Sequence, residues 1–351
     1  MRGILAIAIA LAGCFSPHAA PGAPCSEEGA CPSGLACIGA VCVDPATSPA
    51  IDAPVDTQLD AVPIDACVPV EEICGNGIDE DCDGKDPPCP ANDLLSGAID
   101  ITNGGIFTLD IAAAHSDDTG HGCSPKGGRD VFYKVTLAQP AVFYVDTFSS
   151  NFNTVIRMYP GKPCTQIGNS GAACSNDACG GSHSQLATQL PTGTSCIVIS
   201  QLDADETQGG ITMRAINTGH TGTALGFNGG STAVAATTTT CGGTHLVDAS
   251  CNADAGSPGL DYYFTVCPGN HTVDVSDCDA TWDSVAYLAD AHDTELVCND
   301  DSEMTVACGT VPGNNSHIVA APITGPGIYW AGIAGYTSND CGSFTLTVAI
   351  H

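Results

Sequence analysis

Residues 74–84 read CGNGIDEDCDG and combine alternating carboxylates with two cysteines. Asp79, Asp81 and Asp83 occupy positions 1, 3 and 5 of an EF-hand-like loop, and Gly84 occupies position 6, where the chain must turn. Ca²⁺ prefers about six to eight oxygen ligands, mainly carboxylates and carbonyls. The pattern therefore predicts a Ca²⁺ site, and the alternative is an acidic turn held by disulfides.

The second half of this loop departs from the EF-hand pattern. The backbone carbonyl of Lys85 is the predicted ligand at position 7, but position 12 is Pro90 in place of the bidentate Glu. Asp86 or Asp93 is the predicted substitute. An incomplete ligand set implies weak binding, with a dissociation constant of roughly 10⁻⁴–10⁻³ M, as in extracellular modules. We therefore expect a structural role for this Ca²⁺.

The charge of the chain excludes whole classes of partner. Its 351 residues include 8 basic and 39 acidic side chains, the net charge is −31, and Arg214 is the last basic residue. Phosphate binding needs basic side chains that displace counterions, so nucleic acid is excluded as a partner. An anionic membrane surface is disfavoured for the same reason, and divalent cations are the natural counter-charge.

The first 14 residues, MRGILAIAIALAGC, have the layout of a bacterial export signal. Their apolar run, residues 4–11, is too short to span a bilayer. Leu-Ala-Gly-Cys, residues 11–14, resembles a bacterial lipobox, which implies cleavage before Cys14 and its lipidation. Phe15 then implies sorting to the outer membrane of a Gram-negative bacterium, on either of its faces. Several acyl chains would anchor the protein stably; the alternative is an ordinary cleaved signal peptide.

The cysteine content indicates the same compartment. The chain has 21 cysteines, and removing a lipidated Cys14 leaves an even number, which fits complete pairing in an oxidising environment. Residues 25–42, CSEEGACPSGLACIGAVC, resemble the small cysteine-rich segments near the start of many bacterial surface lipoproteins. This segment is too short for a core, so we expect disulfides to stabilise it. A structural zinc site is the alternative, although the cysteines are not in paired C-x₂-C spacings.

Composition divides the chain into six segments. A stretch rich in Pro, Ala and Asp separates the first cysteines from the acidic motif, and such a stretch predicts a disordered tether. We predict a signal peptide (residues 1–13), a lipidated cysteine-rich segment (14–42), the tether (43–66) and the acidic cysteine-rich motif (67–90). Two β-sandwich repeats follow, at residues 91–219 and 220–351.

The sequence after residue 90 has the composition and turn spacing of an all-β protein. Its strand-like runs occur twice in the same order: GRDVFYKV (128–135) matches GLDYYFTV (259–266), and FNTVIRMY (152–159) matches WDSVAYLA (282–289). No convincing amphipathic helix is present. We therefore predict an all-β fold of two tandem jelly-roll-like β-sandwiches, preceded by a disulfide-rich, largely irregular N-terminal stalk.

These landmarks resemble the bacterial pre-peptidase C-terminal domain, a jelly-roll-like sandwich found in many secreted proteins. Trp282-Asp283-Ser284 resembles its aromatic-Asp-Thr strand, and Asn299-Asp300-Asp301 resembles its Asn-Asp-Asp loop. The first repeat has Asn153 and Ser175-Asn176-Asp177 at these places, so only Asp177 is a candidate there. A surface turn is the alternative. The resemblance implies a second cation site in the second repeat, built from Asp283, Asn299, Asp300 and Asp301. CGNGIDEDCDG itself resembles a metal-binding motif repeated in many bacterial secreted proteins.

The repeat also predicts disulfides. Cys174 aligns with Cys298 and Cys179 with Cys308, so we predict the local pairs Cys174–Cys179 and Cys298–Cys308. The remaining connectivity is not deducible from sequence. Two further cysteines occupy matching positions in the repeats, Cys123 and Cys251.

One more loop has ligand-like side chains. HSDDTGHGC, residues 115–123, combines His with Asp, but it is rich in Gly and its counterpart in the second repeat contains no His. This composition favours a solvated loop over a metal site.

The sequence contains no G-x-S-x-G elbow, H-E-x-x-H helix or phosphate loop. The domain family normally accompanies a catalytic domain, for which this chain has no remaining residues. We therefore expect no enzyme, and predict a lipid-anchored cell-envelope surface protein that acts as a Ca²⁺-stabilised binding or adhesion module for a protein or glycan polymer. The alternatives are a purely structural envelope spacer and a secreted hydrolase or hydrolase accessory.

Overall fold

A computed structural model shows two compact units, Met1–Ala66 and Cys67–His351. Among the described residues, no helix has the length and apolarity needed to cross a membrane. The predicted signal peptide, Cys14 and the predicted tether after Val43 lie outside the described residues. The described residues are 25–26, 30–31, 33–38, 41–43, 69, 74–118, 123, 127–165, 167–168, 172–203, 208–227, 230–302, 308 and 314–351.

The first unit contains a small disulfide-bonded hairpin. Strands β1 (Ala36–Ile38) and β2 (Val41–Val43) pair antiparallel. Two bridges, Cys25–Cys37 and Cys31–Cys42, attach the preceding chain to it. All four cysteines of this segment are therefore oxidised, which confirms the predicted disulfides and leaves no thiolate for the zinc alternative.

The first β-sandwich packs two sheets face to face. Their strand orders are β3-β5-β10-β7-β8 and β4-β11-β6-β9. Alternate residues of β5, such as Val131, Tyr133 and Val135, enter the core between the sheets. The elements are η1 (Leu95–Gly97), β3 (Ile99–Asp100), β4 (Gly105–Asp110), β5 (Asp130–Leu137), β6 (Ala141–Asp146), β7 (Thr154–Tyr159), β8 (Ala173–Asn176), η2 (Ala178–Gly180), β9 (Gln185–Leu190), β10 (Gly193–Gln201) and β11 (Gly210–Asn217).

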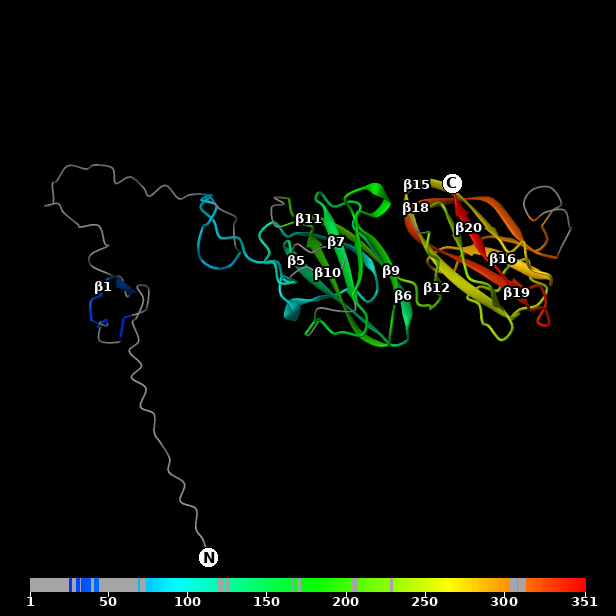
Figure 1. The fold of residues 1–351 in the computed structure, drawn as a ribbon, viewed down its shortest axis with the longest axis horizontal. Coiled ribbons are helices and arrows are strands. Elements are labelled where there is room, and N and C mark those ends of the chain that lie inside the picture. Colours follow the sequence, from blue (N-terminus) through cyan, green and yellow to red (C-terminus); the bar gives the residue numbers. More distant parts are fainter. Residues whose placement is uncertain are drawn as a thin grey trace, which may run out of the picture. The chain divides into compact units, whose positions relative to one another are not determined.

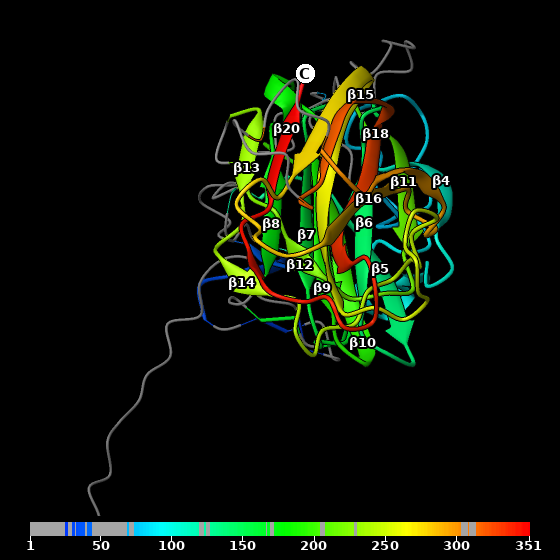
Figure 2. The same cartoon turned by 90° about the vertical axis from the view of Figure 1, so that its right-hand side faces the viewer.

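The second β-sandwich is built around two long antiparallel strands, β15 and β18, which lie side by side in Figure 2. Each strand passes from one layer to the other, so a single seven-stranded sheet forms both layers. The elements are β12 (Thr223–Ala224), β13 (Thr232–Val234), β14 (Thr238–Thr239), β15 (Gly259–Ser276), β16 (Ser284–Ala289), β17 (Glu295–Asn299), β18 (His317–Gly335), β19 (Ser343–Phe344) and β20 (Thr347–Ile350).

The two sandwiches have the same strand order. The first half of β15 pairs with the second half of β18, as β5 pairs with β10, and β16 and β17 follow, as β7 and β8 do. The second half of β15 pairs with β20, as β6 pairs with β11. The predicted fold class, an all-β chain with two sandwiches, is confirmed, and the sequence repeat extends to the topology.

The sandwiches pack against each other through an apolar layer. Val142 and Tyr144 on the outer face of β6 contact a cluster that contains Tyr263, Tyr287 and Trp330 of the second sandwich. Figure 1 shows β6 and β9 of the first sandwich next to the second. Since all six residues of β6 are buried, this strand contributes one face to its own core and the other to the joint.

The disulfides differ from the local pairs predicted from the repeat. Cys174 on β8 bonds to Cys123, and Cys298 on β17 bonds to Cys251, so the matching pair of each repeat joins an edge strand to the loop beside it. The predictions Cys174–Cys179 and Cys298–Cys308 are therefore wrong. Further bridges between described residues of the second unit are Cys74–Cys89, Cys164–Cys196, Cys179–Cys267, Cys241–Cys341 and Cys278–Cys308.

Candidate functional sites

The acidic loop is closed at its base by the Cys74–Cys89 disulfide. Asp79, Asp81 and Asp83 each offer a carboxylate oxygen within 4.8 Å of the others. Gly84 has a φ of 89°, which makes it the turn residue expected at position 6. The backbone wraps around the carboxylates through N–H donors: Gly84 to Asp79 at 2.8 Å, Asp83 to Asp81 at 3.0 Å and Lys85 to Asp83 at 2.9 Å. This convergence fits a small cation site.

Asp86 and Asp93 lie outside this group, contrary to the prediction that one of them completes it. The two Asp86 oxygens accept the backbone N–H groups of Gly75 and Gly77, both at 2.6 Å, so this carboxylate braces the start of the loop. Asp93 is buried and accepts from the backbone N–H of His115 at 2.8 Å, with its other oxygen 2.7 Å from Nδ1. The Lys85 ammonium lies 3.8 Å from Asp83, exposed to solvent; its carbonyl ligand role stays a prediction.

Asp283, Asp300 and Asp301 converge in the second sandwich, again with oxygens within 4.8 Å of one another. Burial, followed by the negative charges of Asp301 and Asp283, raises the pKa of Asp300 to about 6. Burial and the charges of Asp340 and Asp301 also raise the pKa of Asp283. Asp300 Oδ1 is buried and accepts no hydrogen bond from the described residues. A divalent cation would relieve this crowding of like charges.

Asn299 braces this loop from the side. Its Oδ1 accepts the backbone N–H of His317 at 2.8 Å, and its Nδ2 donates to the Asp301 carbonyl at 3.2 Å. The side chain is thus engaged by its own loop, whereas the sequence predicts it as a ligand.

The matching place in the first sandwich has Asn at two of the three Asp positions. Asn153 and Asn176 correspond to Asp283 and Asp300, and their side-chain oxygens are buried without hydrogen-bond partners in the described part of the chain. Asp177 is exposed at a turn with a φ of 56°. Among the residues that the structure describes, Asp177 belongs to no group of three ligand side chains.

The loop of residues 115–118 is partly buried, and its predicted exposure to solvent is wrong for Asp118. Asp118 Oδ2 lies 3.3 Å from Nη1 of Arg157, a guanidinium with no exposed side-chain surface. The Tyr159 hydroxyl donates to the same carboxylate at 3.1 Å. Next to it, the backbone N–H groups of Asp117 and Asp118 donate to Asp130. The signal in the sequence was Arg157, a single basic residue in an apolar strand, which requires a partner when buried.

Polar contacts also cross the joint between the sandwiches, and no pattern in the sequence indicates them. Arg214 donates through Nε to Asp146 at 2.8 Å in its own sandwich and through Nη2 to the carbonyl of Pro326 in the second. Gln185 donates to the Val266 carbonyl at 2.9 Å. That these side chains point out of the first sandwich toward a partner could not be predicted, because the partner atoms belong to the second sandwich.

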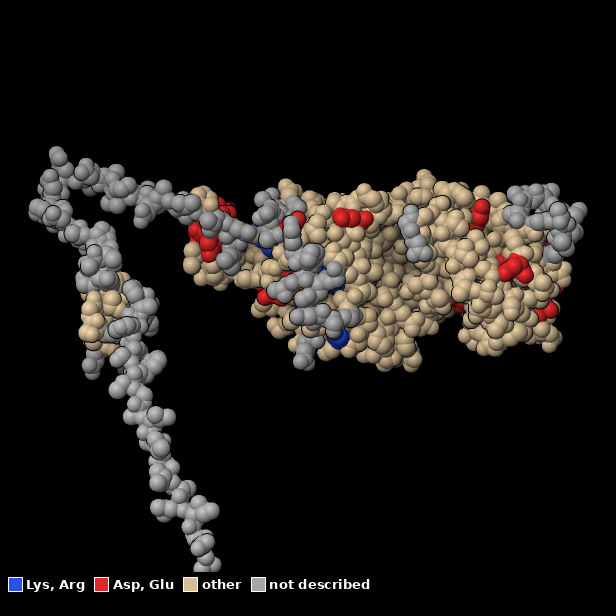
Figure 3. Space-filling model, in the orientation of Figure 1, with Lys and Arg blue, Asp and Glu red and all other residues tan. Residues whose placement is uncertain are grey.

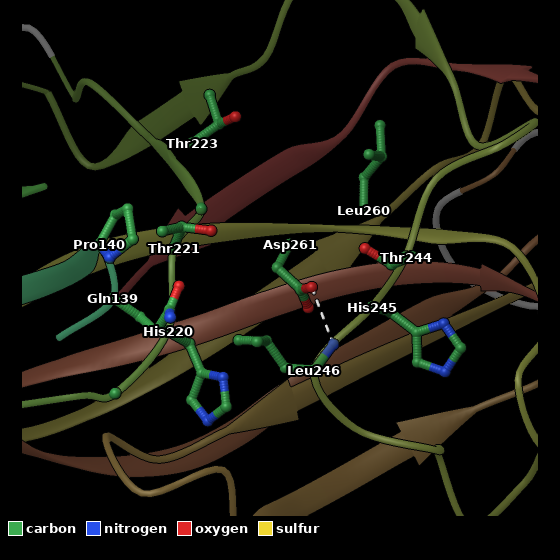
Figure 4. A pocket seen from close by; sticks show the side chains of 12 residues that line it. Gln139, Pro140, His220, Thr221, Thr223, Thr244, His245, Leu246, Leu260 and Asp261 are labelled. Carbon is green, nitrogen blue, oxygen red and sulfur yellow. Dashed lines mark hydrogen bonds between the residues drawn. The ribbon is translucent and has the colours of Figure 1, made fainter. Parts of the chain in front are cut away.

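A crevice of about 600 Å³ opens at this joint (Figure 4). Its walls come from the turn after β5, the segment that links the sandwiches and the loop before β15. Asp261 lies at its floor: its Oδ2 accepts the backbone N–H of Leu246 at 2.9 Å, and its Oδ1 accepts the Tyr287 hydroxyl. Burial raises the pKa of Asp261 to about 6. At one wall, His220 Nε2 lies 2.5 Å from Asp293 Oδ2.

Charge is distributed unevenly over the second unit. The second sandwich has no Lys or Arg, because Arg214 is the last basic residue of the chain. In the face drawn in Figure 3, basic side chains appear on the first sandwich and the loop before it, while acidic ones appear on both sandwiches. Anionic ligands are therefore disfavoured at the second sandwich.

Comparison with known proteins does not assign a family. No family model and no curated protein matches the chain. Among solved structures, it is similar to the CUB1-EGF-CUB2 domains of human MASP-1/3, at 9% identity and a TM-score of 0.18 over 70% of this chain and 99% of that one. It is also similar to the same domains of rat MASP-1, at 10% identity and a TM-score of 0.18 over 72% of this chain and 99% of that one. A third similar structure is the isomalto-dextranase of Arthrobacter globiformis T6, at 10% identity and a TM-score of 0.19 over 65% of this chain and 35% of that one. With TM-scores this low, the fold assignment depends on the strand pairing described above.

Proposed function

We propose that this chain is a non-catalytic cell-envelope surface protein whose two-sandwich unit binds an extracellular polymer, either protein or glycan. The observation that carries this proposal is the fixed joint between the sandwiches. The disulfide Cys179–Cys267 and the apolar layer around Tyr144 and Trp330 hold the two sandwiches together. Surfaces on both therefore keep a constant spacing and orientation.

A constant spacing suits a polymer ligand. Consecutive units of a polymer reach two neighbouring surfaces at once, so the second contact is intramolecular and adds avidity. A rigid joint lowers the ordering cost of such binding, because the surfaces need no rearrangement. Separate domains joined by a mobile linker would lose conformational entropy each time a ligand orders them.

The lipid anchor and the outer-membrane location are part of the proposal. Their support is the lipobox-like Leu-Ala-Gly-Cys ending at Cys14 and the many disulfides, which form in oxidising compartments. Mass spectrometry of the mature N-terminus tests the anchor: a diacylglyceryl and acyl mass on Cys14 supports it, and an unmodified cysteine or cleavage at another residue contradicts it.

Ca²⁺ is proposed as a weak structural ligand of the two acidic groups, Asp79-Asp81-Asp83 and Asp283-Asp300-Asp301. Their convergence within 4.8 Å supports this, and so does the raised pKa of Asp300, to which the charges of Asp301 and Asp283 contribute after burial. The ion would hold the loops and take no part in a reaction.

The main experiment is retention of the purified protein on insoluble polymers. A panel of matrix proteins and polysaccharides is incubated with the protein, with and without Ca²⁺, and the bound fraction is measured after washing. Saturable retention on at least one polymer supports the binding module. If no polymer retains the protein, the binding function is contradicted and the second candidate, an envelope spacer, is favoured. In a spacer, the same rigid joint would only hold the two sandwiches at a constant length.

A further inference from the structure

The crevice between the sandwiches contains polar side chains that the fold itself does not use. Gln139, Thr221, Thr223 and Thr244 line it, are exposed, and make no side-chain hydrogen bond within the described part of the chain. Figure 4 shows the hydroxyl groups of Thr221 and Thr244 directed into the space between opposite walls. Its volume of about 600 Å³ lies within the range of small-molecule sites, about 300–1,000 Å³.

The titratable side chains of the crevice, in contrast, each have a partner, although Nδ1 of His245 is buried without one in the described part of the chain. Asp261 accepts hydrogen bonds on both oxygens, from Leu246 and Tyr287. His245 has a side chain only 4% exposed, with Nε2 3.1 Å from an Asp248 oxygen. These bonds hold the floor and one wall of the crevice in place, so the hydroxyl and amide groups that line it are preorganised for a ligand.

This distribution of groups indicates a neutral ligand. Among the described residues, no Lys or Arg lines the crevice, and its two histidines, His220 and His245, each lie against an aspartate. A phosphate, sulfate or carboxylate would therefore meet no unpaired cation, and it would lie beside the buried carboxyl of Asp261. Hydroxyl and amide side chains each donate and accept hydrogen bonds, as the hydroxyl groups of a sugar do. Pro140, Leu246 and Leu260 supply apolar surface for the C–H face of a sugar ring.

A peptide fits this place less well. Extended peptides commonly bind by adding a strand to a free sheet edge. At the crevice, the first half of β15 is paired with β18, and the short strand β12 pairs with its other side at Tyr262 and Tyr263. In the ranges that the structure describes, the part of β15 at the crevice is therefore open on the β12 side before Tyr262, which leaves a short edge for strand addition, and the remaining walls are turns and linker.

We propose that this crevice binds a neutral sugar residue of a polysaccharide, held by Gln139, Thr221 and Thr244. The inference rests on the proposed polymer-binding function and narrows its ligand to an uncharged glycan. A bound sugar contacts both sandwiches, since Gln139 belongs to the first and Thr244 to the second. Because no Phe, Tyr or Trp is among the described residues that line the crevice, we expect a dissociation constant on the order of 1 mM for a single hexose.

The test is ligand-observed NMR of the full-length protein with glucose, galactose, mannose, N-acetylglucosamine and their oligomers, and with glucuronic acid as the anionic comparison. We expect millimolar binding of at least one neutral sugar and weaker binding of glucuronic acid. The double variant Thr221→Val, Thr244→Val should weaken binding at least about tenfold, since it removes two hydrogen-bonding groups at nearly constant shape. Thr232→Val, at an exposed strand position outside the crevice, is the matched control and should bind as the unmodified protein does.

Three results would overturn the inference: no binding of any neutral sugar, tighter binding of glucuronic acid, or unchanged binding in the double variant with an unchanged melting curve. The polymer assay keeps the two proposals apart. If the double variant is still retained on a polymer, or if only protein polymers retain the chain, the crevice is not the site although the binding function stands. If no polymer retains the protein but free sugar binds at the crevice, the polymer-binding function is contradicted while the sugar site stands.

Discussion

Cys179 and Cys267 join the two sandwiches by a disulfide that closes 88 residues of sequence, with their Cα atoms 5.6 Å apart. Cys179 lies in the turn of η2, after the edge strand β8, and Cys267 lies within β15. The bond thus connects the turn after an edge strand of the first sandwich to a central strand of the second. A non-covalent joint between domains usually permits relative motion, and this covalent one restricts it.

Replacing both cysteines, Cys179→Ser and Cys267→Ser, should lower the free energy of unfolding by about 2–4 kcal/mol, because the unfolded chain loses a long-range constraint. Denaturant titration measures this change. Residual dipolar couplings should also show increased motion between the sandwiches. The control is Cys25→Ser with Cys37→Ser, which removes a bridge of the first unit and should leave the melting of the sandwiches unchanged. Equal effects of both double variants would contradict the special role of the joint.

Arg157 is expected to be the most sensitive charged residue. Its guanidinium is buried against Asp118 and Ser200, so Arg157→Met leaves the Asp118 carboxylate buried without its cation. We expect a loss of about 3–5 kcal/mol in the free energy of unfolding, measured by denaturant titration.

The exposed pair Lys85–Asp83 provides the matched control, because Lys85→Met should change stability by less than about 1 kcal/mol. Combining Arg157→Met with Asp118→Asn should recover part of the loss, since the unpaired charge is then gone. If Arg157→Met behaves like Lys85→Met, the buried ion pair is not a structural requirement.

The strands were predictable from sequence because their signal is local. The run DVFYKVTL coincides with β5, and the matched runs of the second repeat lie in β15 and β16. The disulfides were not predictable, because Cys174 meets Cys123 only after β8 takes its place at the sheet edge. The alignment of Cys123 with Cys251 did contain that information, since both bond to aligned partners.

The joint and its crevice lay further beyond the reach of sequence. A strand such as AVFYVD, apolar at nearly every position, indicates burial on both faces, but not what covers the second face. Asp261 and Thr244 come together with Gln139 only through the packing of one sandwich on the other. The acidic groups, by contrast, were found because their ligands are close in sequence or carried by repeat-matched strands.

Stability should increase on mild acidification. Burial raises the pKa of Asp130 to about 8 and the pKa values of Asp261 and Asp277 to about 6. The folded state therefore binds more protons than the unfolded chain, whose Asp pKa is near 3.9. The stabilising contribution is complete below that value and is lost as pH rises through 6 and then 8. Thermal melts from pH 4.5 to 8.5 measure the slope.

Asp130→Asn should flatten the upper part of this profile, between about pH 6 and 8. The amide oxygen can still accept the N–H groups of Asp117 and Asp118, so the shape of the site is kept. The matched comparison is Asp177→Asn, an exposed carboxylate whose replacement should leave the profile unchanged. A profile that stays steep in Asp130→Asn would show that another group carries the dependence.

The second cation group allows a test of Ca²⁺ that uses the same linkage. Crowding with Asp301 and Asp283 contributes to the raised pKa of Asp300, about 6, so protons and Ca²⁺ compete for the same oxygens. Millimolar Ca²⁺ should raise the melting temperature of the sandwiches at pH 7.5 and have less effect at pH 5, where Asp300 is mostly protonated. Asp300→Asn should reduce the Ca²⁺ response at pH 7.5 while raising stability in the presence of a chelator, because it removes a repelled charge. Asp79→Asn should reduce only the part of the response that comes from the acidic loop, and Asp177→Asn should leave the response intact. Identical melts with Ca²⁺ and with chelator at both pH values would exclude Ca²⁺ from both groups and leave them as acidic turns.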